Sequence, residues 1–134
     1  MNYSRRVKKL EAVYALLPKI ACKGLCHTAC VHVAMAPIEH ERIRATYGKD
    51  VLEKRTVKEN LDKSFTILQV YGDPEMLNCP ALTEDKRCGI YEARPLICRC
   101  FGIAQSIQCP HGCEPEGILS DAQAAELQHI VEAI

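Results

Sequence analysis

Apolar side chains recur every three or four positions near the start of the chain, which is the spacing of one face of an α-helix. The residues on this face are Val7, Leu10, Tyr14 and Leu17. Asn2 or Ser4 can cap the first turn, and Pro18 ends the pattern. The sequence therefore predicts a helix over residues 4–17 whose apolar face belongs to the core.

Two further helices have clear start and stop signals. Pro37 suits the first turn of the second helix, and Gly48 suits its end. Ser120 opens the last helix, where Gln123 completes a capping box. The apolar residues expected on the core-facing sides are Ile38, Ile43 and Tyr47 in the second helix and Leu127, Ile130, Val131 and Ile134 in the last.

The pattern between the second and the last helix leaves two readings open. Residues 50–63 are charged and compatible with a helix. Residues 64–71 favour a strand by composition, although Leu61, Phe65 and Leu68 also fit helical spacing. Local sequence alone does not decide between these readings.

Length, composition and charge exclude several classes of protein. The 134 residues hold 17 Lys and Arg against 17 Asp and Glu, which excludes a strongly basic nucleic-acid-binding protein. We find neither a run of eighteen apolar residues nor a secretory signal, so we expect no membrane contact and a cytoplasmic location. The fold we expect is one mainly α-helical domain over residues 1–134, with little or no β-sheet.

Charge is divided between the two ends of the chain. Residues 1–30 carry six Lys and Arg against one acid, whereas residues 114–134 carry five acids and neither Lys nor Arg. Because these charges are complementary, we expect the two terminal helices to lie near each other.

The chain holds nine cysteines, far more than an ordinary domain of this length. Disulfides rarely persist in a reducing cytosol, and an odd count does not fit complete pairing, so metal ligation is the leading explanation. The alternative is a set of buried thiols that only pack in the core. The cysteines are Cys22, Cys26, Cys30, Cys79, Cys88, Cys98, Cys100, Cys109 and Cys113. With no Trp to fill the core, we expect the domain to be organised around the cysteine site.

Local signals also bear on how the cysteines are placed. The x3 spacings of Cys22, Cys26 and Cys30 would put all three sulfurs on one face of a helix. The polar residues 83–87 predict a hairpin that returns the chain toward Cys79, and Pro95 is placed to start a short helix.

Basic residues close to the cysteines suit a metal site. Four thiolates around Zn²⁺, or around a [4Fe–4S]²⁺ core, leave a net negative charge that is costly to bury without partners. Arg94 and Arg99 flank Cys98 and are the best candidates to offset this charge, with Lys23 and Arg87 as further candidates. The alternative for each is an exposed surface cation.

The cysteine spacing leaves the metal undecided. Zinc ribbons and the common ferredoxin runs contain C-x2-C, which this chain lacks. The later intervals, from Cys79 onward, are x8, x9, x1, x8 and x3. One cluster with spare thiols and a two-metal site both fit, for zinc as for iron.

Two stretches resemble the signature of a known family. They are Cys79-Pro80-Ala81-Leu82 and Cys88-Gly89-Ile90-Tyr91-Glu92-Ala93-Arg94-Pro95-Leu96-Ile97-Cys98-Arg99-Cys100-Phe101. Both are similar to the "CPxL … CxIYxxRPxxCRxF" signature of the YkgJ-type cysteine-cluster family, to which zinc or iron chelation is attributed. The resemblance covers roughly residues 22–113, so the terminal helices flank it.

The resemblance implies a set of metal ligands. The implied ligands are Cys22, Cys26, Cys30, Cys79, Cys88, Cys98 and Cys109. The first three correspond to the family's cluster only as a group, because its usual C-x2-C-G-x-C-C is replaced by two x3 spacings and Val31 stands where a doubled cysteine is expected. Cys100 and Cys113 are additions to the pattern.

The resemblance also implies a function. Similar modules are attached to lysine methylases that act on flagellin, where an iron–sulfur cluster is implied. We therefore expect a small metal-chelating protein that binds an iron–sulfur cluster of the 4Fe-4S type, in a redox or structural role and with a protein or redox partner. The alternative is a zinc-stabilised module that binds another protein.

A standalone enzyme is the least favoured class. His40 and Glu41 could begin an H-E-x-x-H motif, but Arg44 occupies the position of the second histidine. The sequence shows neither a phosphate-binding Gly-rich loop nor a nucleophile elbow. His27 and His111 lie inside the cysteine groups, where the favoured reading is an exposed or hydrogen-bonded side chain and the alternative is a ligand or proton shuttle.

Overall fold

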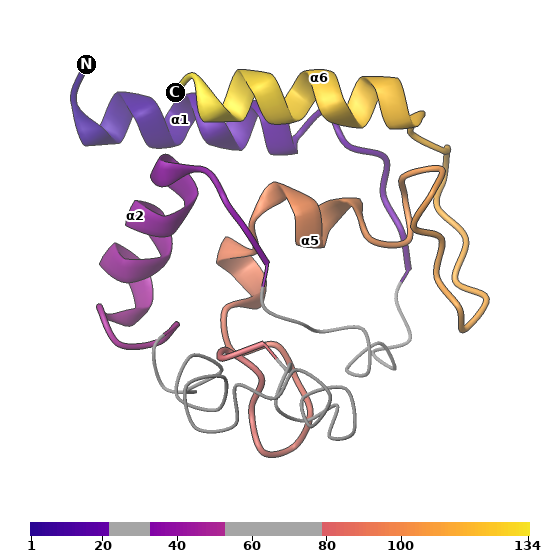
Figure 1. Ribbon diagram of the computed structural model, residues 1–134, viewed down its shortest axis with the longest axis horizontal. Helices are drawn as coiled ribbons and strands as arrows, with labels where there is room; N and C mark the ends of the chain where they lie inside the picture. The colour runs from indigo at the N-terminus through magenta and orange to yellow at the C-terminus, as the bar shows by residue number, and fades with distance from the viewer. Residues whose placement is uncertain (22–32, 53–78) are drawn as a thin grey trace, which may run out of the picture.

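The computed structural model describes residues 1–21, 33–52 and 79–134. These residues form the helices α1 (Tyr3–Tyr14), α2 (Pro37–Tyr47), α5 (Leu96–Cys100) and α6 (Asp121–Glu132), and a 3-10 turn η3 (Tyr91–Ala93), as Figure 1 shows. In the described part of the chain, β-structure is limited to three isolated bridges. The prediction of a mainly helical fold is confirmed. The predicted helix and strand within residues 50–71 lie almost wholly outside the described residues.

The N-terminal helix begins at its predicted cap and ends earlier than predicted. The side chain of Asn2, rather than that of Ser4, accepts a hydrogen bond of 2.9 Å from the backbone amide of Arg5. The helix ends at Tyr14, and the last residues up to Leu17 form a tighter turn through amide bonds that reach back only three positions. Pro18 lies just beyond this turn. Residue 17, the predicted end of the helix, is therefore the last residue of the tight turn that follows the helix.

α2 begins and ends as the sequence predicts, and α6 (Asp121–Glu132) begins at its predicted cap. Pro37 stands in the first turn of α2, and Gly48 ends it with a φ of 99°, a conformation that glycine adopts without strain. In α6 the hydroxyl of Ser120 accepts from the amide of Gln123, whose side chain accepts from the amide of Ser120 in return.

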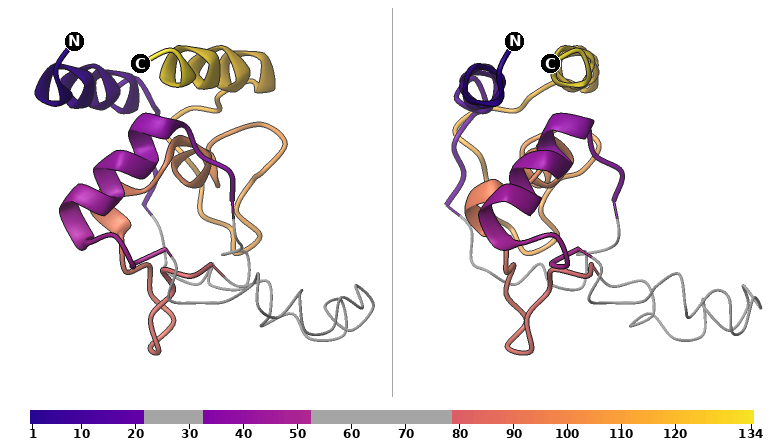
Figure 2. Two further views of the ribbon diagram at one scale, coloured as in Figure 1. Left: turned by 60° about the vertical axis from the view of Figure 1, so that its left-hand side comes forward. Right: turned by 90° about the vertical axis from the view of Figure 1, so that its left-hand side faces the viewer.

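The helices α1 and α6 lie side by side in antiparallel directions, as Figures 1 and 2 show. The Nε of Arg6 donates to the backbone carbonyl of Ile134 at 3.3 Å across this pair. The ion pairs of α1 within the described residues join it to α2: Arg6 with Glu41 at 2.8 Å and Arg42 with Glu11 at 3.1 Å. The terminal helices therefore lie together as expected, but they share an apolar core rather than ion pairs.

Two clusters of buried apolar side chains hold these elements together. The main cluster contains Leu10, Val13, Tyr14, Ala36, Ile38, Leu96, Cys100, Ile103, Ala104, Leu119 and Val131. The second cluster contains Ile43, Ala81, Ile90 and Ala93, with Met35, Val51, Leu52, Cys79 and Cys88 packed against it. The main cluster thus unites both ends of the chain, whereas the second cluster carries two of the cysteines.

The hairpin predicted around residues 83–87 is present. Leu82 pairs with Cys88 in an antiparallel bridge, and the amide of Gly89 donates to the carbonyl of Ala81 at 2.8 Å. A side chain at position 89 would place its Cβ only 2.7 Å from that carbonyl, so the close return requires glycine. The hairpin lies away from α1 and α6 (Figure 2). None of the described helices has the length and hydropathy needed to cross a bilayer.

Candidate metal centre

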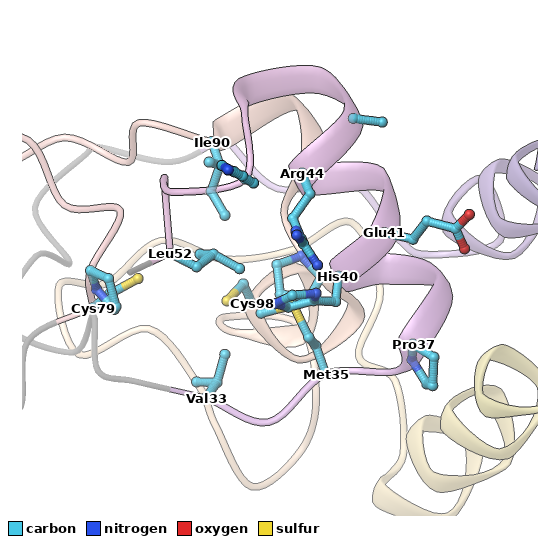
Figure 3. Close-up of a pocket in the computed structure, with 14 residues that line it drawn as sticks. Val33, Met35, Pro37, His40, Glu41, Arg44, Leu52, Cys79, Ile90 and Cys98 are labelled. Atoms are coloured by element: carbon cyan, nitrogen blue, oxygen red, sulfur yellow. The ribbon is translucent and has the colours of Figure 1, made fainter. Parts of the chain in front are cut away.

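A cavity of about 940 Å³ lies between α2, α5 and the start of the hairpin. Its lining residues are Val33, Met35, Pro37, His40, Glu41, Arg44, Ala45, Lys49, Leu52, Cys79, Pro80, Ile90, Pro95 and Cys98. Figure 3 shows the thiols of Cys79 and Cys98 pointing into this cavity from opposite sides. The structure therefore brings two of the predicted ligands to one space.

These two thiols are positioned by different elements. Cys79 directly precedes the hairpin and packs against the second cluster. Cys98 lies on α5, which begins after Pro95, a residue whose extended backbone turns the chain into the helix. Both cysteines are half-buried, so their sulfurs are accessible from the cavity yet fixed by packing.

Cys100 lies on the same short helix in a different environment. It belongs to the main cluster and is only 4% exposed. Burial, and then the negative charge of Glu39, raise the pKa of the Cys100 thiol. Because metals bind the thiolate form, these surroundings disfavour Cys100 as a ligand.

The remaining described cysteines lie outside the residues that line the cavity. Cys88 is half-buried at the return of the hairpin and packs against the same cluster as Cys79. Cys109 accepts a hydrogen bond of 3.4 Å from the backbone amide of His111, and Cys113 in the same loop is buried. This loop continues to Pro115, which pairs with Ile20.

The predicted ligands Cys22, Cys26 and Cys30 lie outside the described residues. Across residues 1–21, 33–52 and 79–134, no three His, Cys, Asp or Glu side chains are close enough together to hold a metal ion. Among the described residues, Val33, Leu52 and Cys79 lie around this cavity (Figure 3).

The two arginines predicted to offset the thiolate charge are held by backbone carbonyls and tyrosine rings. Arg99 donates to the carbonyl of Arg94 at 2.7 Å and stacks 3.9 Å from the ring centre of Tyr14. Arg94 donates to the carbonyl of Tyr91 at 3.0 Å and stacks on that ring. Burial lowers the pKa of Arg99, which remains a cation at neutral pH. These contacts fix both charges beside α5.

A buried carboxylate that the sequence analysis did not single out joins three helices. Glu39 is 1% exposed and accepts the hydroxyl of Tyr14 at 2.6 Å. Its oxygens also accept the amide of Leu96, at the start of α5, and the amide of Ala36, at the start of α2. The sequence signal for Glu39 is local: it stands three positions after Ala36, the cap of α2, and a glutamate there commonly accepts a hydrogen bond from the amide of the cap.

The cavity wall formed by α2 carries basic side chains. His40 and Arg44 are one helical turn apart and both line the cavity, as does Lys49 just beyond the helix. In the sequence, His40 is notable only as the first residue of an incomplete H-E-x-x-H motif. The spacing of four residues predicts that His40 and Arg44 lie on the same face of the helix. It does not predict which other part of the protein this face contacts.

A comparison with family models finds a match over most of the chain. The model named CxxCxxCC, described as "Putative zinc- or iron-chelating domain", matches residues 21–125. No curated protein and no solved structure matches the chain.

Proposed function

Because the chain belongs to the CxxCxxCC family, whose description is metal chelation, we propose that it binds an iron–sulfur cluster through cysteine thiolates. The observation that carries this proposal is the pair Cys79 and Cys98, which point into one cavity from opposite sides (Figure 3). Thiolates are the usual protein ligands of such clusters.

The cavity also has room for a group larger than one ion. Its volume is about 940 Å³. Thiols on opposite sides are suited to hold a cluster, because the iron and sulfide atoms of the cluster fill the space between its ligands. In the sequence, Cys30 precedes Val33, a residue that lines this cavity, by three positions.

We include two more cysteines in the donor set. Cys88 packs against the same apolar cluster as Cys79, and Cys109 is the downstream cysteine of the signature. The set exceeds the four ligands that one cluster takes, so single substitutions will separate ligands from spare thiols.

The charge of the surroundings supports the proposal. A cluster with four thiolates is an anion, and its burial requires nearby cations or hydrogen-bond donors. Arg44 and Lys49 line the cavity, whereas Arg94 and Arg99 are not among its lining residues and stack on the rings of Tyr91 and Tyr14. When bound, the cluster supplies a site that takes up and releases one electron; the cations that line the cavity would set its potential.

Anaerobic purification followed by iron and acid-labile sulfide analysis tests the proposal. We expect both elements in the wild-type chain, with a broad visible band that bleaches with dithionite. Cys98→Ala should abolish or strongly reduce the loading, whereas the matched variant Cys100→Ala should keep it, because Cys100 lies in the apolar core. A colourless protein that holds zinc and no sulfide would overturn the iron–sulfur proposal in favour of a zinc-stabilised interaction module.

A further inference from the structure

The helices α1 and α6 form one layer of the molecule, and no described element covers the side of this layer that faces away from α2 (Figure 2). A groove of about 450 Å³ lies between the two helices. Its lining includes Lys9 and Ala12 from α1 and Ile130 from α6. Arg6 and Glu11, whose side chains bind α2, do not line it, so the groove opens on the uncovered side of the layer.

The surface of this groove is apolar and reaches the solvent. Apart from Lys9, all of its lining residues are apolar. Among them, Ile130 is 45% exposed and Met1 is 70% exposed, although both side chains are large. A helix face of this kind is normally buried against another element. The groove therefore has the character of an interface.

The two helices that flank the groove carry opposite charge. α1 holds four Lys and Arg against one Glu, a formal charge of +3, whereas α6 holds three acids and neither Lys nor Arg, a formal charge of −3. Lys8 and Lys9 are exposed, as is Glu126, and within the described residues none of the three forms an ion pair. Glu126 lies one helical turn before Ile130 and so shares its face of α6. These charges are available to a partner.

The division of charge selects the kind of partner. A nucleic acid or an anionic membrane would be attracted by α1 but repelled by α6 beside it. A surface that is half basic and half acidic is instead complementary to itself, when a two-fold rotation about an axis parallel to the helices places α1 of one copy over α6 of the other. A rotation that places α1 over α1 would bring Lys8 and Lys9 against their own copies.

We propose that the groove between α1 and α6 is the interface of a homodimer, in which α1 of each copy lies over α6 of the other. The four helices form a bundle in which each helix is antiparallel to its neighbours. Ala12 and Ile130 are buried in this interface, and the contact between Lys9 of one copy and Glu126 of the other occurs twice. The inference is independent of the metal centre.

Sedimentation equilibrium of the full chain, purified anaerobically, tests the proposal. We expect twice the 15.0 kDa mass of one chain, with dissociation on dilution that salt promotes because it screens the charge contacts. Ile130→Asp should raise the dissociation constant at least about tenfold, because it places a charge in the apolar interface. The matched control Ile118→Asp changes an isoleucine that is 62% exposed and lies outside both helices, so it should leave the dissociation constant unchanged.

An exchange of charge between two chains tests how the helices pair. Lys9→Glu alone and Glu126→Lys alone should each weaken the dimer, because each variant brings like charges together at both contacts. An equimolar mixture of the two variants should dimerise as tightly as the wild type, since both contacts then join opposite charges. Contacts within one chain would not produce this recovery.

Three outcomes would overturn the proposal: a monomer at every concentration at which the chain is soluble, a dimer that Ile130→Asp leaves intact, or a mixture of the two charge variants that stays monomeric. Retention of a monomeric chain on anionic vesicles or on duplex DNA would overturn it as well and assign the face to that partner. Circular dichroism checks the fold of each variant. The charge variants change only exposed side chains, so they keep the test decisive if Ile130→Asp loses helical structure.

Discussion

Single residues in this protein differ sharply in role even when they are close in sequence. Cys98 lines the cavity, whereas Cys100, two positions later on α5, belongs to the main apolar cluster. Glu39 is buried and accepts bonds from three elements, whereas Glu41 on the same helix faces Arg6 at the surface. These pairs provide matched variants for experiments.

Replacement of Glu39 by alanine should cost about 3 kcal/mol or more of the free energy of unfolding. The variant leaves the Tyr14 hydroxyl and two backbone amides buried without an acceptor, and each such group costs about 1–3 kcal/mol. Glu41→Ala, which removes an exposed ion pair, should cost less than about 1 kcal/mol. Urea unfolding of both variants measures the difference. Equal losses would contradict the central role of Glu39.

Tyr14 should make the protein less stable at alkaline pH. Burial, and then its bond to Glu39, raise the pKa of Tyr14 well above its ordinary value. The unfolded chain releases this proton above about pH 10 while the folded chain still holds it, so the free energy of unfolding falls as the pH rises further. Tyr14→Phe should flatten this decline, unlike the control Tyr47→Phe, whose side chain is exposed. Unfolding curves between about pH 9 and pH 11 provide the test.

At the scale of whole elements, helix ends could be predicted because their causes are local. Pro37, Gly48, Ser120 and Gln123 act through backbone geometry and short-range bonds, and all four hold the expected places. The end of α1 was predicted less accurately than these. The last residues before Pro18 can form either an α-helical turn or a tighter turn, and the two differ little in hydrogen bonding.

The cap of α1 offers a test at this scale. Asn2→Ala should lower the free energy of unfolding by about 1 kcal/mol, because it removes the acceptor for the amide of Arg5. Ser4→Ala should change it by less than about 0.5 kcal/mol, since Ser4 lies inside the helix and alanine is the better helix former there. Thermal unfolding of both variants checks the order. A larger loss for Ser4→Ala would contradict the assignment of the cap.

The candidate site could be predicted only in part, since it depends on contacts between distant elements. The signature identified Cys79 and Cys98, and both line the cavity. The tie between Glu39 and Leu96 spans 57 positions, and no periodicity within α2 or α5 reveals it. The same holds for His40, because a helical pattern shows which residues share a face but not which element that face meets.

At the scale of the whole molecule, the two apolar clusters should respond differently to metal removal. The main cluster joins α1, α5 and α6. The second cluster is small, and Cys79 and Cys88 pack against it. A structural metal can contribute on the order of 10 kcal/mol to folding, and the part of the molecule nearest to it depends on it most.

Removal of the metal should therefore loosen residues 79–93 before it loosens α1. We expect the amides of Gly89 and Ala93, which are bonded within this region, to exchange with solvent faster after anaerobic chelation. Amides in the centre of α1 should stay protected, because Leu10 and Val13 remain packed in the main cluster. Hydrogen exchange read by mass spectrometry or NMR resolves the two regions. Simultaneous loss of protection in both would show that the clusters unfold as one unit.

The main cluster also bears on how the protein is made, because it joins segments that leave the ribosome at very different times. Arg6 and Ile134, which meet across α1 and α6, are 128 positions apart in the chain. The second cluster takes its described residues from positions 35–93, all of which leave the ribosome before α6 does. The cysteine cavity can thus form while the main core still lacks one wall, and the docking of α6 would complete that core.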